Sequence, residues 1–86
     1  MGNDPLAPKP PASLSVTDYD RAHAAQYLRL LDAEASGACW EEAAHHILGL
    51  DIELEPDAAR ACHAAHLSRA IWLREGGYLE VLGRAV

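Results

Sequence analysis

Apolar residues at three- and four-residue spacing dominate this chain and restrict what it can fold into. Ala24, Tyr27, Leu28, Leu31 and Ala35 form one such stripe, as expected of a helix with a single buried face. Phenylalanine is absent and alanine, the best helix former, is abundant. We therefore predict an all-α fold.

Local signals predict where the first helix begins and ends. Thr17 or Asp18 can cap its first turn, and Thr17 and Asp20 stand at capping-box spacing. Gly37 is suited to a left-handed stop. The sequence thus predicts a helix over 18–36.

Two further helices are predicted. The second covers 39–48 and closes at Gly49, and the third covers 56–75, with Pro56 in its first turn and Gly76-Gly77 at its end. The alternating run 50–55 resembles a strand, but an isolated strand has no partner, so we expect an extended connector pinned by its apolar residues Leu50, Ile52 and Leu54. Residues 78–82 are expected to form a short C-terminal helix folded back over the core.

This order predicts a three-helix, helix-turn-helix-like domain with an extended turn and a short C-terminal helix, over residues 17–86. Residues 1–16 are expected to be a disordered tail, because they hold four prolines and few large apolar residues. These prolines are Pro5, Pro8, Pro10 and Pro11.

The charges argue against nucleic acid as the partner. The chain has 13 acidic and 7 basic residues and a formal net charge of −6. Six carboxylates and no lysine or arginine fall within 40–57, where the second helix, turn and third helix of a DNA reader approach phosphates. The plainer interpretation is that these charges only keep a small domain dissolved. The six are Glu41, Glu42, Asp51, Glu53, Glu55 and Asp57.

Histidine and cysteine residues raise the question of a metal. Zinc needs four nitrogen or sulfur ligands, but the chain has no Cys-x-x-Cys pair and no evident fourth ligand. We expect no metal, no cofactor and no catalytic residues, with Cys62 as a small core residue and the histidines at the edges of the core. The candidates weighed are His45, His46, Cys62, His63 and His66.

A protein partner is the remaining expectation. Aromatic residues and arginine dominate protein interfaces, and a set near the end of the third helix fits that description, although a core role for most of it is the competing interpretation. The set is Arg69, Trp72, Leu73, Tyr78 and Leu79. No apolar stretch is long enough to span a membrane, and a cytoplasmic monomer is expected.

Several runs resemble a known family. Residues 19–23, 27–33, 37–42, 65–73 and 77–78 resemble the RovC-like DNA-binding family, first described as a domain of unknown function, which occurs in proteobacterial mobile elements. The resemblance implies an extended-turn helix-turn-helix fold. It also implies two functional branches: basic members that contact DNA within activators of conjugative transfer, and stand-alone acidic members that act as antiactivators.

The length and charge of this chain resemble the acidic branch. We therefore predict a transcriptional antiactivator that binds the N-terminal domain of an activator of conjugative-element transfer and does not bind DNA. The alternative is a small DNA-binding transcriptional regulator of the helix-turn-helix type.

Overall fold

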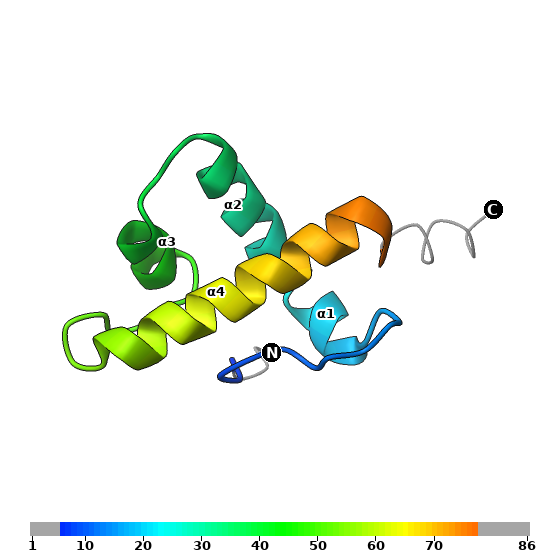
Figure 1. Ribbon diagram of the computed structural model, residues 1–86, viewed down its shortest axis with the longest axis horizontal. Coiled ribbons are helices and arrows are strands. Elements are labelled where there is room, and N and C mark those ends of the chain that lie inside the picture. Colours follow the sequence, from blue (N-terminus) through cyan, green and yellow to red (C-terminus); the bar gives the residue numbers. More distant parts are fainter. Residues whose placement is uncertain (1–5, 78–86) are drawn as a thin grey trace.

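The computed structural model describes residues 6–77, which form four α-helices and a terminal π-helical turn (Figure 1). The helices are α1 (Asp18–Ala22), α2 (Ala24–Ala35), α3 (Trp40–His46) and α4 (Pro56–Trp72), followed by the π-helical turn η1 (Leu73–Gly77). No strand occurs within 6–77. The all-α prediction is confirmed, and the arrangement is compatible with a small helix-turn-helix-like domain.

The predicted first helix is divided in two at His23. This residue has φ −109° and ψ 16°, outside the helical range, and it both ends α1 and precedes α2. Its backbone amide and its buried imidazole Nδ1 both lie 3.0 Å from the carbonyl oxygen of Tyr19, so one carbonyl is shared by two groups of His23 at the break. The prediction of one helix over 18–36 is wrong at this point.

The helix ends follow the local signals. Thr17 caps α1 with a complete capping box, in which Asp20 is the reciprocal partner. Gly37, with φ 80°, stops α2, and the Ala38 amide donates to the carbonyl of Ala33 at 3.0 Å, as in a Schellman motif. Pro56 opens α4 as predicted.

The predicted connector is a hydrogen-bonded turn. The Asp51 carboxylate accepts the amides of Glu53 and Leu54 at 3.1 and 2.9 Å, and local side-chain bonds of this kind favour turns over extended chain. Leu50 and Ile52 are half-buried, as expected of anchors. Leu54 is 75% exposed and does not pin the turn to the core.

Helix α4 crosses both α2 and α3 and forms the central element of the domain (Figure 1). A small apolar cluster of Leu30, Ala43 and Leu48 lies where these helices meet, with Ile47 and Leu67 packed against it. Buried alanines in α3 and α4 allow the helices to approach closely.

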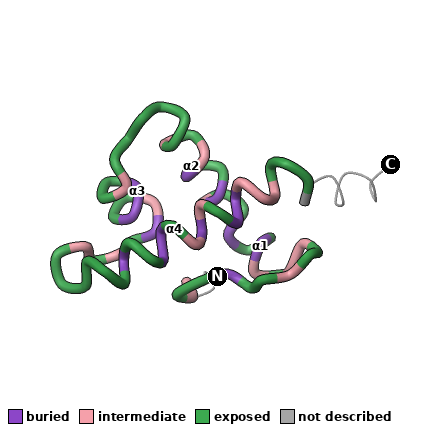
Figure 2. The backbone as a smooth tube through the Cα atoms, in the orientation of Figure 1, coloured by how far each residue is buried: buried purple, intermediate pink, exposed green. Residues whose placement is uncertain are grey.

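The buried face of the first helical segment is not the predicted apolar stripe. The buried positions of α1 and α2 are Asp20, Tyr27 and Leu30, with His23 between the helices (Figure 2). These residues also repeat at three- and four-residue steps, so they form one face. From the predicted stripe, only Tyr27 is buried.

The N-terminal segment packs against the helices. Pro10 is buried, and Leu6 packs against the apolar cluster. The Ala7 amide donates to the Tyr19 hydroxyl at 3.0 Å. Over residues 6–16 the chain thus differs from the expected tail, because α1 and α4 supply hydrogen-bond partners for a segment that has few of its own.

The helices in residues 6–77 are too short or too polar to cross a membrane. The predicted C-terminal helix, with Tyr78 and Leu79, lies outside the described residues.

Candidate functional site

A buried ion pair joins α1 to α4. The Arg69 Nη2 and Asp20 Oδ2 atoms are 2.7 Å apart, and Arg69 Nε donates to Asp20 Oδ1 at 3.0 Å. The Asp20 carboxylate also accepts the Thr17 amide at 2.9 Å and the Tyr27 hydroxyl at 3.0 Å. Four donors therefore surround one buried carboxylate, as a buried charge requires.

These donors set the ionisation of Asp20. Burial by itself would raise the pKa of this carboxyl, but the hydrogen bonds from Arg69, Thr17 and Tyr27 and the charge of Arg69 outweigh it and lower the pKa. Asp20 is therefore a stable anion at neutral pH. Burial, with the bond to this anion, raises the pKa of Tyr27 far above its ordinary value.

Arg69 was expected to be an exposed partner contact, and the structure gives it an internal role. Its side chain is 8% exposed. Besides Asp20, it donates to the carbonyls of Ser13 at 2.6 Å and Ser15 at 2.9 Å. Its guanidinium carbon lies 4.2 Å from the Trp72 ring centroid, a cation–π contact. Arg69 thus ties the N-terminal segment, α1 and the end of α4 together.

A second buried network centres on His66, which is fully buried. Its Nδ1 lies 2.7 Å from the Cys62 carbonyl oxygen, so Nδ1 carries the proton that is donated there. The Nε2 atom then accepts the Tyr19 hydroxyl at 2.6 Å. Burial lowers the pKa of His66, and this tautomer is the neutral form that the two bonds require.

The metal candidates divide between two environments. Cys62, His63 and His66 are buried in α4, whereas His45 and His46 are exposed at the end of α3. Cys62 Sγ and His66 Nδ1 are 3.6 Å apart, but Nδ1 is already bonded to a carbonyl. Within 6–77, no three His, Cys, Asp or Glu residues are grouped so that they could hold a metal ion.

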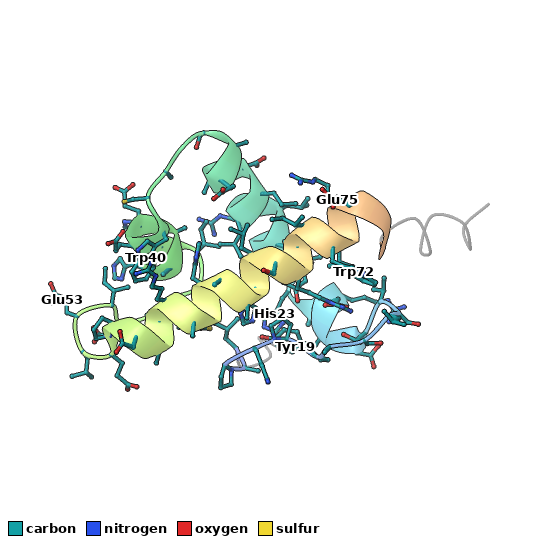
Figure 3. All side chains as sticks on the ribbon, in the orientation of Figure 1. Tyr19, His23, Trp40, Glu53, Trp72 and Glu75 are labelled. Atoms are coloured by element: carbon teal, nitrogen blue, oxygen red, sulfur yellow. The ribbon has the colours of Figure 1, made fainter. Side chains whose placement is uncertain are left out.

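The six predicted acidic residues are all exposed. They lie on α3, in the 51–55 turn and at the start of α4, the end of α4 that is farther from Trp72 (Figure 3). Asp51 also has a structural role, because its carboxylate accepts a backbone amide in the 51–55 turn. The first arginine after this span, Arg60, lies over Trp40 at 5.7 Å. We call this set, residues 41–57, the acidic surface.

The predicted partner set is brought together only in part. Trp72 and Leu73 lie next to each other and are half-buried at the end of α4. Arg69 is enclosed beneath Trp72. Sequence reasoning missed the role of Asp20; the signal available was its capping-box position, which indicates a local function and gives no hint of a partner 49 residues away.

The helices and the turn before α4 are compatible with a small helix-turn-helix-like domain. A family model described as the DNA-binding domain of a T6SS transcription factor, RovC, matches residues 3–83, and the chain belongs to this family. This confirms the resemblance to RovC-like domains. No curated protein matches the chain.

Proposed function

We propose that this domain is a transcriptional antiactivator that acts by binding another protein. Its partner would be the N-terminal domain of an activator of conjugative-element transfer. In this proposal the domain keeps the fold of a DNA-binding module while its DNA-facing surface no longer attracts DNA. It has no catalytic role and needs no cofactor.

The acidic surface is the observation that carries the proposal. A helix-turn-helix protein places the N-terminal end of its recognition helix in the major groove, with the preceding elements at the phosphates. Here that end begins with Glu55, Pro56 and Asp57, all exposed. Carboxylates at these positions repel phosphates and release no counterions from DNA. They therefore oppose the electrostatic attraction to the phosphate backbone, which contributes most of the affinity for DNA.

A DNA-binding regulator is the second candidate. The description of the matching family, a DNA-binding domain, favours it directly. Arg60, Arg69 and Arg74 are the arginines of α4 and η1. Arg69 is buried and paired with Asp20, so only Arg60 and Arg74 of this group are left to contact phosphates. So few basic contacts favour the protein-binding candidate.

An NMR titration separates the two candidates. Isotopically labelled protein is titrated with promoter DNA at low salt, and in parallel with the N-terminal domain of the cognate activator. We expect shifts on one contiguous face with the activator and none with DNA. Shifts with DNA centred on residues 50–66, and none with protein, would overturn the antiactivator proposal.

A further inference from the structure

An apolar groove runs between α1, α2 and the C-terminal end of α4. Its volume is about 500 Å³, within the range of ligand-binding clefts. The apolar residues that line it come from four segments of the chain: Val16, Ala24, Leu28, Leu31, Ala70 and Leu73.

The groove exposes the face of α2 that the core leaves uncovered. Tyr27 and Leu30 are 3% and 1% exposed, while the adjacent Leu28 is 63% exposed. Ala24, Leu28 and Leu31 stand at helical spacing and all line the groove. The domain therefore covers the side of α2 that carries Tyr27 and Leu30, and Tyr27 also contributes to the lining of the groove, whereas the side with Leu28 stays exposed. Contiguous exposed apolar residues occur at protein–protein interaction sites and in ligand-binding grooves.

Two of the three charged side chains that line the groove are basic, in a protein that is acidic as a whole. These are Arg21 and Arg74, in a chain of formal net charge −6. Asp20 is the one carboxylate among the described lining residues, and Arg69 already neutralises it at 2.7 Å.

The two arginines are free to exchange their present partners. Arg21 pairs with Asp18 at 3.0 Å and Arg74 with Glu75 at 3.5 Å, and all four side chains are more than half exposed. Exposed pairs of this kind are weak. A carboxylate on a docking partner can therefore replace either one at little cost.

We infer that the groove binds an amphipathic helix of the partner protein, whose apolar face is flanked by glutamate or aspartate. A groove between helices accepts such a segment through residues at i, i+3 or i+4, and i+7. This inference rests on the proposed function, because it names the chemistry of the protein partner. The acidic surface lies toward the other end of α4, so the two surfaces are separate.

Two matched synthetic peptides test the inference with the full, isotopically labelled chain. Both carry leucines at three- and four-residue helical spacing; one has glutamates on both flanks and the other has lysines in their place. We expect the glutamate peptide to shift the signals of Leu28, Leu31 and Leu73. It should bind at least about tenfold tighter than the lysine peptide.

Variants locate the binding surface. Leu28→Gln is expected to weaken binding of the glutamate peptide, whereas Leu54→Gln, at a leucine that is 75% exposed and outside the groove, leaves it unchanged. The double variant Arg21→Glu/Arg74→Glu should reverse the preference between the peptides. Circular dichroism of each variant verifies that the fold is retained.

Several results would overturn the inference. If both peptides bind equally well, or if the shifted signals lie outside the groove, the groove does not bind an acidic amphipathic helix. Concentration-dependent shifts at Leu28 and Leu31 without peptide would assign the groove to a second copy. Nuclear Overhauser contacts from these leucines to residues after Gly77 would assign it to the same chain. If neither peptide binds but the protein still binds the activator through another face, this inference is wrong and the proposed function is retained. If the protein binds DNA and not the activator, the proposed function is wrong.

Discussion

Arg69 and Asp20 form a two-bond ion pair inside the domain, with Nη2–Oδ2 and Nε–Oδ1 distances of 2.7 and 3.0 Å. The same aspartate completes the capping box of α1, and the same arginine holds the carbonyls of Ser13 and Ser15. One pair thus connects the start of the first helix, the N-terminal segment and the last long helix.

Removing one member of this pair should be severe. Asp20→Ala leaves the buried guanidinium of Arg69 without a counter-charge, and we expect a loss of about 3–5 kcal/mol in the free energy of unfolding, measured by urea denaturation. Arg21→Ala, which removes an exposed pair with Asp18, is the matched control and should change stability little. In a double-mutant cycle, the Asp20→Ala/Arg69→Ala protein should lose less than the sum of the single losses. Additive losses would show that the two side chains act independently.

Acid should weaken the domain through Asp20. Its pKa is lowered in the folded state from an ordinary value of 3.8, so the unfolded chain binds the proton more readily. The stabilisation is complete above about pH 4 and is lost as the pH falls through the lower, folded-state pKa. Urea midpoints measured at successive pH values should therefore fall below about pH 4. Asp20→Asn, although less stable at neutral pH, should show a smaller fall over this range.

A second loss of stability should begin at a higher pH and comes from the buried histidines His63 and His66, since burial lowers the pKa of both; His66 is the more deeply buried. Burial lowers its pKa from 6.5, so as the pH falls below 6.5 the unfolded chain takes up a proton that the folded chain resists. Stability contributed by neutral His66 is present above that pH and decreases below it. The Hε1 resonance of His66 in an NMR titration should give a midpoint below 6.5. A midpoint at or above this value would contradict the buried, neutral tautomer.

Tyr19→Phe should release the N-terminal segment. The substitution keeps the ring that stacks on His23 at 4.1 Å but removes the hydroxyl between the Ala7 amide and His66 Nε2. Leaving a buried acceptor unpaired costs about 1–3 kcal/mol. Hydrogen exchange at the Ala7 amide should become faster. The control is Ser36→Ala, whose exposed hydroxyl bonds locally to Ala33; unchanged exchange at Ala7 in Tyr19→Phe would argue against the contact.

Reversing charge on the acidic surface should create DNA binding. Glu53→Lys/Glu55→Lys places cations beside the start of α4, and each new phosphate contact should add about 0.9 to the slope of log affinity against log salt. The control Asp32→Lys/Glu75→Lys makes the same net change at exposed positions on α2 and η1. Fluorescence anisotropy with duplex DNA at several salt concentrations measures both. Equal gains in the two proteins would show that net charge matters and the position does not.

Several helix ends could be predicted from the sequence. A cap or a left-handed glycine acts through its immediate neighbours, so Thr17, Gly37 and Pro56 could be assigned by local chemistry, and each does what it was expected to do. The all-α class and the exposure of the acidic surface followed from pattern and charge in the same way.

The tertiary structure alone decided which faces are buried. The apolar stripe of α2 predicted a core made from Leu28 and Leu31, but these residues line the groove, and a charged and aromatic face takes the inner position. Asp20 can be buried only because Arg69 arrives from a helix 49 residues away, and no local pattern can indicate such a pairing. Within residues 6–77, the sequence by itself determined the helical class and the start or end of individual helices, because capping and periodicity are local, but it did not indicate the break at His23. Packing decided which side of each helix faces inward, because the partners that satisfy a buried charge come from distant parts of the chain.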